Sequence, residues 1–468
     1  MCPLPRRTFL QTVGWLATAR GFGDRISVES LVESFVHESF ESGLNLIANG
    51  FRNQRNVDNI FKAIFIAGIR EIRPRHVGGK LHAVMMAQPL RELARRLHRR
   101  DRFCLAAWHL HDLKESLARD QQDGDWSLST FDKEGTGEPG NWDELREAME
   151  RWDDSVSDRA VQRALRVIDA EDLAMRLVPY AAGSFVNIGH KMILATQVLR
   201  MQRGVGWDYG ESVLRATVHG LLFRGDGDAQ NEGTELSWKL ADKLSNVPLR
   251  YHSDSGRTLG LLLHLRNGTA QQAQELVFER LRSGESVRAV WDALILRAAE
   301  IVASRKDVDR PARREALLPV HAITVTESLE FAFYDANELR TRRFYVLQAA
   351  NWLLRMDQAL RRIVGLRQDV AILDEWWSAR ANLVGTTPPQ IGMSHLLESG
   401  FEISAWVQAL VRSGQEHHQH KYLAACLNLL DRFDPELRPL LLCPIFGYIP
   451  TPGDPPSSLM QRIREEIR

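Results

Sequence analysis

Cysteine is scarce in this sequence, and its spacing fits neither a disulfide framework nor a metal-binding pair. The chain of 468 residues contains four cysteines, too few for a disulfide scaffold of this length. No two of them have CxxC spacing, which excludes a zinc ribbon and a thioredoxin-like motif. Cys104 and Cys426 stand in apolar helical runs, where a free thiol packs as a small hydrophobic side chain.

Long hydrophobic runs and an excess of charge of one sign are also missing. No apolar run approaches the roughly 20 residues that a membrane-spanning helix requires. The 60 lysines and arginines balance the 60 aspartates and glutamates, and the two signs are interspersed, as on solvated helix faces. We therefore expect neither a membrane span nor a nucleic-acid partner.

The common catalytic signatures are absent as well. Segment 135–140, GTGEPG, matches GxGxxG by letter, but no strand pattern precedes it, so it does not indicate a dinucleotide-binding fold. There is no GxSxG nucleophile elbow. There is also no HExxH or ExxH pair. Motifs therefore give no support to an α/β-hydrolase, a zincin or a ferritin-like di-iron protein.

Helical periodicity dominates what is present, and strand alternation with Asn-Gly or Asp-Gly hairpins is hardly seen. The pattern predicts an all-α fold, a large single multi-helical domain over residues 25–455 without a fixed-period repeat. Two packed helical halves, divided near residue 130, are the alternative. Segment 120–142 is rich in polar and turn-forming residues and predicts a long lid-like loop. Residues 456–468 are expected to form a C-terminal tail.

Two interpretations of residues 1–24 are open. The run RRTFLQ at 6–11 resembles a twin-arginine export motif, and the small residues at 17–19 suit a cleavage site. Export to the periplasm by the twin-arginine route follows from that interpretation. The apolar stretch between the two features is short, and RRTFLQ also suits the start of an amphipathic helix in a cytoplasmic protein.

Histidine is the residue whose setting stands out. Five apolar helical segments contain or begin with histidines: VNIGHKMIL (His190), RATVHGLLF (His219), LPVHAITVTESL (His321), EHHQHKYLAAC (His417, His418, His420) and GGKLHAVMM (His82). A buried neutral imidazole needs partners for both ring nitrogens. Several such residues in one core are costly unless they meet one another, a metal ion or a bound polar ligand. Each of them taken singly is also compatible with a structural role.

We therefore predict a histidine-lined apolar pocket for an aromatic or other small hydrophobic molecule. Its expected catalytic residues are His190, His219, His321, His420 and Asp112. Its expected metal ligands are His190, His321, His418, His420 and Glu416. Glu416 and His420 are four residues apart and can chelate one ion together, and imidazole suits iron or copper. Neutral histidine can also act as a base toward a phenol.

Four segments together resemble the questin oxidase-like family, in its bacterial helical branch. They are GSFVNIGHKMILATQVLR, LLPVHAITVTESLEFAF, SGQEHHQHKYLAACLNLLDRF and the region from HVGGKLHAVMM to GDWSL. The resemblance covers roughly residues 40 to 450. It implies an oxygenase of Baeyer–Villiger type that uses a nicotinamide reductant such as NADPH. The positions that match are His190, His321 and His418 or His420. The family more often has a histidine near Val186 or Asn187, whereas this chain has only His190 there.

Three hypotheses follow. The first is a helical oxidoreductase with the pocket described above. The second is a helical scaffold or binding protein whose histidines only satisfy buried groups. The third is a metal- or haem-binding protein without turnover.

Overall fold

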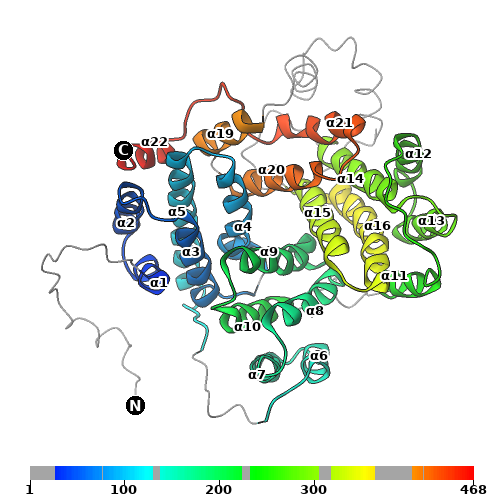
Figure 1. The fold of residues 1–468 in the computed structure, drawn as a ribbon, viewed down its shortest axis with the longest axis horizontal. Helices are drawn as coiled ribbons and strands as arrows, with labels where there is room; N and C mark the ends of the chain where they lie inside the picture. Colours follow the sequence, from blue (N-terminus) through cyan, green and yellow to red (C-terminus); the bar gives the residue numbers. More distant parts are fainter. Residues whose placement is uncertain are drawn as a thin grey trace, which may run out of the picture.

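Helices account for the secondary structure throughout the described part of this computed structural model, in which no strand occurs (Figure 1). The structure describes residues 27–75, 77–129, 138–223, 232–304, 318–363, 403–414 and 416–468. The predicted all-α class is confirmed. No described helix combines the length and the apolar character needed to cross a membrane.

The helices of the N-terminal part of the chain reach to residue 221. They are α1 (Val28–His37), α2 (Phe40–Arg52), α3 (Val57–Glu71), α4 (His82–Arg95), α5 (Arg99–Gln122), α6 (Trp142–Glu150), α7 (Asp154–Ala164), α8 (Ala170–Ala182), α9 (His190–Val205) and α10 (Gly210–Leu221), with the short 3-10 helices η2 (Gly79–Leu81) and η3 (Val186–Gly189).

The remaining helices follow residue 231. They are α11 (Glu232–Lys243), α12 (Ser255–Leu265), α13 (Ala270–Arg282), α14 (Val287–Ala303), α15 (Val320–Asp335), α16 (Leu339–Ile363), α19 (Ile403–Ser413), α20 (His417–Leu430), α21 (Arg438–Leu442) and α22 (Ser458–Glu466), with the 3-10 helices η6 (Pro435–Leu437) and η7 (Cys443–Gly447).

Four helices from distant parts of the chain form a closed ring at the centre. Helix α4 packs against α9, α9 against α15, α15 against α20, and α20 against α4. Figure 1 shows these four helices in the middle of the molecule, with α1, α2, α3 and α5 on one side and α11 to α14 and α16 on the other. Helices α3 and α5 cover α4, α8 and α10 pack on α9, and α14 and α16 pack on α15. The ring is therefore shielded by a second layer of helices.

One hydrophobic core extends across residue 130. Helix α4, which precedes that position, packs on α9 and α20, which follow it. The structure thus favours the single domain over two separate halves. The predicted tail at residues 456–468 contains helix α22. Met460 and Ile463 of this helix are buried and anchor the tail to the core.

Two other sequence predictions fall partly or wholly outside the described residues. The predicted loop 120–142 begins inside α5, which continues to Gln122, and residues 130–137 are not described. The proposed export signal at residues 1–24 is also outside the described part of the chain. Both therefore stay predictions.

Three of the four ring helices begin differently from most of the others. Many outer helices start with a polar side chain that accepts a hydrogen bond from the first turn, as Ser27 does for α1 and Asp153 for α7. Such caps satisfy backbone N–H groups that have no partner within the helix. No side-chain cap of this kind starts α4, α9 or α15. Each of these three helices begins instead with a histidine in its first two positions.

Candidate metal centre

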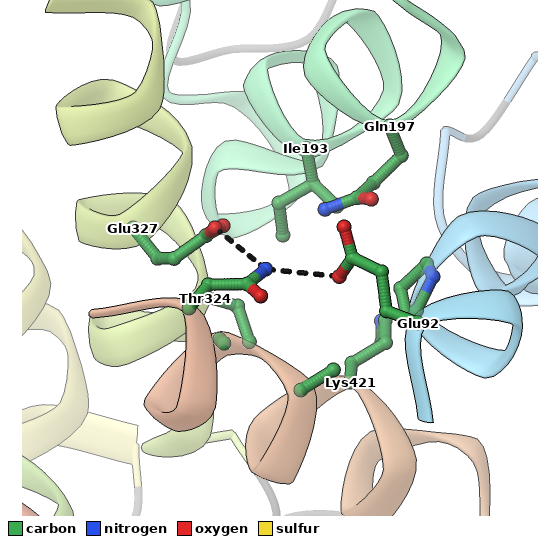
Figure 2. A pocket seen from close by; sticks show the side chains of 10 residues that line it. Glu92, Ile193, Gln197, Thr324, Glu327 and Lys421 are labelled. Carbon is green, nitrogen blue, oxygen red and sulfur yellow. Dashed lines mark hydrogen bonds between the residues drawn. The ribbon is translucent and has the colours of Figure 1, made fainter. Parts of the chain in front are cut away.

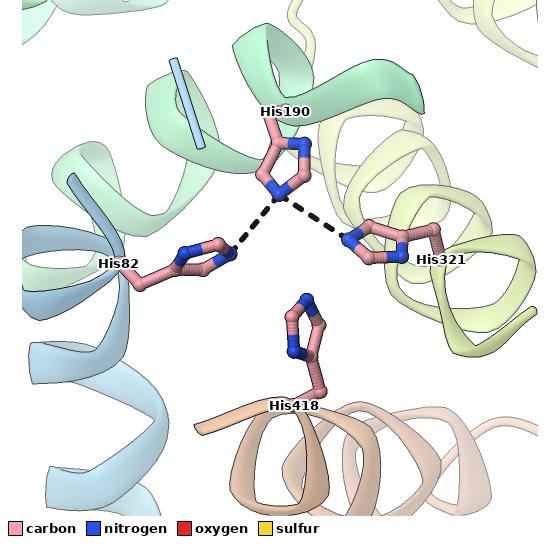
Figure 3. A group of neighbouring side chains, drawn as sticks. All are labelled: His82, His190, His321 and His418. Atoms are coloured by element: carbon pink, nitrogen blue, oxygen red, sulfur yellow. Dashed lines mark hydrogen bonds between the residues drawn. The ribbon is translucent and has the colours of Figure 1, made fainter. Parts of the chain in front are cut away.

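The four ring helices bring four buried histidines together at their N-terminal ends. They are His82 of α4, His190 of α9, His321 of α15 and His418 of α20, which we call the four-histidine cluster. One ligand atom of each lies within 4.8 Å of those of the other three. Figure 3 shows the four rings pointing toward a common centre. The exposed fraction of each residue is 6% or less, so bulk water does not solvate the centre.

Each ring is fixed through its outer nitrogen, Nδ1. His82 Nδ1 contacts the carbonyl oxygen of Gly79 at 2.6 Å, and His321 Nδ1 contacts that of Leu318 at 3.0 Å. His190 Nδ1 makes the same bond to the carbonyl oxygen of Asn187. In all three cases the carbonyl belongs to the residue three positions earlier. His418 differs, because its Nδ1 lies 2.7 Å from Oε1 of Glu416.

These partners decide where the ring protons are. A backbone carbonyl oxygen can only accept a hydrogen bond, so Nδ1 of His82, His190 and His321 must carry the proton and donate it. In a neutral imidazole the other nitrogen, Nε2, then has a lone pair and no hydrogen. The same holds for His418 beside an ionised Glu416. Four Nε2 lone pairs therefore face one another in a buried space.

The spacing of these Nε2 atoms suits a bound metal ion. His82 Nε2 and His190 Nε2 are 3.1 Å apart, and His190 Nε2 and His321 Nε2 are 3.2 Å apart. Two nitrogens bound to one tetrahedral ion at about 2.0–2.1 Å are separated by about 3.3 Å. Without a proton between them, two lone pairs at this distance repel each other. A metal ion at the centre would bind these lone pairs and so remove the repulsion between them.

Tight turns set the direction of two of these rings. Asn187 and Ile188 in η3 have φ of 48° and 52°, and Gly189 has φ of 82°. Left-handed backbone is unusual for a β-branched residue such as Ile188 and costs about 1–2 kcal/mol. A Cβ atom at Gly189 would lie 2.7 Å from Cγ2 of Val325, so only glycine fits there. Strain of this kind is concentrated at functional sites.

The turn before His82 supports His190 as well. Gly78 has φ of 121°, and a Cβ atom there would lie 3.4 Å from the His190 ring. The side-chain amide of Asn187 donates to the carbonyl of Val77 at 3.0 Å. The two turns therefore hold each other, and with them the rings of His82 and His190.

Glu416 connects the cluster to a second histidine on α20. Its Oε1 lies 2.7 Å from His418 Nδ1 and 3.0 Å from His417 Nε2. Its Oε2 also accepts from the backbone N–H of His418 at 2.6 Å and so caps the helix. The His417 ring stacks on that of His82, with centroids 4.0 Å apart. Glu416, His417 and His418 form a second group of potential ligands.

Burial keeps the cluster neutral. Loss of hydration, followed by repulsion from neighbouring cationic groups, lowers the pKa of His82, His321 and His418 well below the ordinary value. Buried imidazoles of this kind are uncharged at neutral pH and present lone pairs rather than protons. Neutral imidazole is the form that binds metal ions.

Two histidines of the sequence prediction, His219 and His420, lie outside the four-histidine cluster. His219 of α10 is 3.4 Å from Oδ1 of Asp158 and is partly exposed. His420 is buried against the ring of Trp108, with centroids 4.3 Å apart, and its Nδ1 contacts the carbonyl of Glu416. His418 and His420 are two positions apart on α20, so they face different sides of the helix.

Of the two carboxylates predicted as site residues, Glu416 contacts the four-histidine cluster and Asp112 does not. Glu416 orients His418, as a carboxylate next to a metal-ligating histidine commonly does. Asp112 is 3.9 Å from His417 Nδ1 and makes no bond to the cluster. Burial and the nearby Glu115 raise the pKa of Asp112 to about 7. It belongs to the surroundings of His417 rather than to the four-histidine cluster.

His82 is the member of the cluster that was absent from the predicted ligands. The sequence VGGKLHAV places it three residues after Gly79, at the start of an apolar helix. His190 follows VNIG and His321 follows LLPV in the same way. In all three segments a glycine or proline precedes the histidine by one to three residues, and the histidine stands at the start of an apolar helix. This shared pattern could have identified His82 as a ligand.

None of the four clustered histidines lines the cavity on the ring helices, whose lining has six polar and four apolar residues. A small cavity is lined by residues of the same four helices: Pro89, Glu92, Ile193, Gln197, Thr324, Glu327, Lys421, Ala424, Ala425 and Asn428 (Figure 2). Asn428 Nδ2 donates to Glu92 at 3.0 Å and to Glu327 at 3.1 Å. About 10 Å³ is open to the centre of a water molecule, which is room for one water.

Comparisons with known proteins find no match for this chain among protein-family models, curated proteins or solved structures. The resemblance to questin oxidase-like proteins therefore stays a prediction.

Proposed function

We propose that this protein is a metal-dependent oxidoreductase whose centre is a divalent transition-metal ion held by Nε2 of the four-histidine cluster. The observation that supports it is the position of the protons on the imidazole rings of the cluster. Each Nδ1 is bound by an acceptor, so four lone pairs converge on one buried point. Imidazole ligands suit iron, copper, zinc and nickel.

A purely structural role for the histidines explains the cluster less well. Histidines that only fill a core bond both nitrogens to ordinary donors and acceptors. Here the inner nitrogens of His82 and His321 each contact that of His190. Strained turns hold the rings of His190 and His82, and a carboxylate orients that of His418, an arrangement typical of metal sites. Packing alone does not require rings in fixed orientations, so this arrangement favours a bound ion.

The oxidoreductase part of the proposal has a separate basis. Four neutral ligands leave the positive charge of the ion uncompensated except by Glu416. Iron and copper can change oxidation state in such surroundings, and iron retains free coordination positions beside four ligands. A closed tetrahedral zinc site that only joins four helices is the second candidate, since such structural sites have four protein ligands.

The test is metal analysis of protein purified without a histidine tag, followed by reconstitution of the metal-free protein with iron(II), copper(II) or zinc(II). Wild-type protein is compared with His82→Ala and His190→Ala. His420→Ala is the matched control, because His420 is equally buried on the same helix as His418 but lies outside the cluster.

We expect about one ion per chain in wild type and in His420→Ala, and loss of the ion in both cluster variants. An absorption spectrum that changes with dithionite or ferricyanide supports a redox centre. A stoichiometric zinc ion that neither iron nor copper replaces favours the structural site. Wild-type protein that binds none of the three ions contradicts the metal proposal.

A further inference from the structure

Two partly exposed side chains with metal-binding atoms contact the four-histidine cluster. The exposed fraction of each clustered histidine is 6% or less, whereas the side chains of Glu416 and His417 are 31% and 20% exposed. The ring of His417 stacks on that of His82, with centroids 4.0 Å apart, and its centroid lies 4.5 Å from that of His418. A continuous row of potential ligands therefore leads from the partly exposed His417 to the buried cluster.

A buried carboxylate, that of Asp112 on α5, lies beside His417. Its Oδ1 is 3.9 Å from His417 Nδ1, and its Oδ2 has no hydrogen-bond partner among the described residues. The whole residue is 8% exposed. Nζ of the buried Lys421 also makes no hydrogen bond in the part of the chain that the structure describes, so it does not pair with this carboxylate. A buried polar atom without a partner is unfavourable. Asp112 thus offers an unpaired carboxylate oxygen to a cation beside His417.

Each ring nitrogen of His417 is close to a carboxylate oxygen. Nδ1 is near Oδ1 of Asp112, and Nε2 lies 3.0 Å from Oε1 of Glu416. The same Oε1 atom is 2.7 Å from Nδ1 of His418. An ion therefore has two successive positions, the first between Asp112 and His417, and the second between His417 and Glu416, next to His418. Carboxylate oxygens and imidazole nitrogens are both common ligands of divalent transition metals.

An ion that enters the folded protein needs ligands of this kind on its way. A divalent ion in water carries a hydration shell, and its transfer to a buried site is costly unless protein groups replace the water. Charge of the opposite sign at an entrance also attracts the ion and raises its association rate by about 10- to 1000-fold. The four neutral histidines of the cluster supply no such attraction. The carboxylates of Asp112 and Glu416 do.

We propose that Asp112, Glu416 and His417 form a capture site through which a hydrated divalent transition-metal ion enters and leaves the four-histidine cluster. This inference rests on the proposed metal function. The ion binds first between Asp112 and His417 and exchanges part of its water for these ligands. It then moves past Glu416 to the clustered Nε2 atoms, where its remaining water is replaced.

A capture site has a kinetic signature that a structural role does not share. A residue that contacts the ion only on its route lowers the barrier to entry and the barrier to exit equally. Its loss therefore slows uptake and release by the same factor and leaves the Kd unchanged. A residue that stabilises the loaded cluster changes the Kd instead, because it acts on the bound state.

The experiment measures uptake and release of zinc(II) by folded, full-length, metal-free protein in a stopped-flow instrument, with a chromogenic chelator that reports free zinc. The test variant is Asp112→Asn and its matched control is Asp101→Asn. Asp101 is a partly buried carboxylate of the same helix, and it is paired with Arg464 at 2.8 Å. His417→Ala is the second test variant, in case Asp112→Asn fails to fold. Its control is His111→Ala, because the His111 ring is partly exposed and packs edge-on against Phe40.

We expect uptake and release to be about tenfold slower in Asp112→Asn and in His417→Ala, the lower end of the electrostatic effect on association. The Kd of Asp112→Asn should stay within about twofold of the wild-type value, and both controls should keep the wild-type rates. Wild-type rates in Asp112→Asn and His417→Ala overturn the capture site and leave the metal proposal standing. So does a slower uptake with unchanged release, or wild-type protein that acquires zinc only when it is refolded. Wild-type protein that retains neither zinc, iron nor copper overturns both proposals.

Discussion

The Nε2 atoms of His82 and His190 lie 3.1 Å apart, and neither carries a proton, because each ring donates its Nδ1 hydrogen to a backbone carbonyl. Atoms with lone pairs do not approach so closely in a buried space without cost. The distance is explained if the two nitrogens are two of the four ligands of one metal ion. The folded state without the ion is then less stable than the folded state with it.

Removal of the ion should therefore lower stability. A ligand that binds only the folded state at a concentration of 100 times its Kd adds about 2.7 kcal/mol to the free energy of unfolding. We expect the melting temperature of reconstituted protein to fall on treatment with a chelator and to recover when the ion is added back. The His190→Ala variant should show neither change. Equal responses of both proteins would show that the chelator acts elsewhere.

Glu416→Gln should weaken metal binding without unfolding α20. Glutamine can still accept from the backbone N–H of His418 and so keep the helix cap, but it loses the negative charge that holds His418 Nδ1. Loss of a partner of this type commonly lowers metal affinity about 10- to 100-fold. A competition titration against a chromogenic chelator measures the change. Asp112→Asn, which alters a carboxylate without a bond to the cluster, should have a smaller effect.

Acid should destabilise the metal-free protein over a defined range of pH. Burial lowers the pKa of His109 and of His420 from 6.5 to about 4. Between these values the unfolded chain binds protons that the folded protein does not, so the free energy of unfolding falls as pH falls. Above about pH 6.5 both states are neutral, and below about pH 4 both are protonated, so the slope from these groups vanishes at either end.

Each of these two histidines should contribute about 3 kcal/mol over that range, since one pKa unit is about 1.36 kcal/mol. Urea unfolding at several pH values between 7 and 4 measures the slope. His109→Gln removes one titrating group and should reduce the slope by about one proton. A variant with the unchanged wild-type slope would show that His109 is not neutral in the folded protein.

Gly189→Ala should destabilise the protein and weaken metal binding although Gly189 is not a ligand. Alanine at φ of 82° costs about 1–2 kcal/mol, and its Cβ would collide with Val325 Cγ2. Displacement of the turn would move His190, the next residue. Gly206→Ala is the control, because Gly206 also has positive φ but its Cβ would meet nothing closer than 3.8 Å. Thermal unfolding and metal titration of both variants should show the larger losses in Gly189→Ala.

The sequence was sufficient to predict several properties of this protein. Apolar residues at helical spacing and the near absence of strand patterns predicted an all-α fold, because a helix buries one face wherever that spacing occurs. Histidines at the starts of apolar helices predicted a buried imidazole site, because both ring nitrogens need partners there. His190, His321 and His418 were named from this pattern, whereas Glu416 was named from its four-residue spacing to His420, which lies outside the cluster.

Only the tertiary structure decided which histidines meet. His82 and His190 are separated by 108 positions and His190 and His321 by 131, and no local pattern reports contacts between residues so far apart. The packing of α4, α9, α15 and α20 into a ring placed His82 in the cluster and directed His219 and His420 elsewhere. A helix rotates by about 100° per residue. Two positions along α20 therefore separate a clustered His418 from a His420 that faces Trp108, and only the neighbouring helices determine which of those faces is the site.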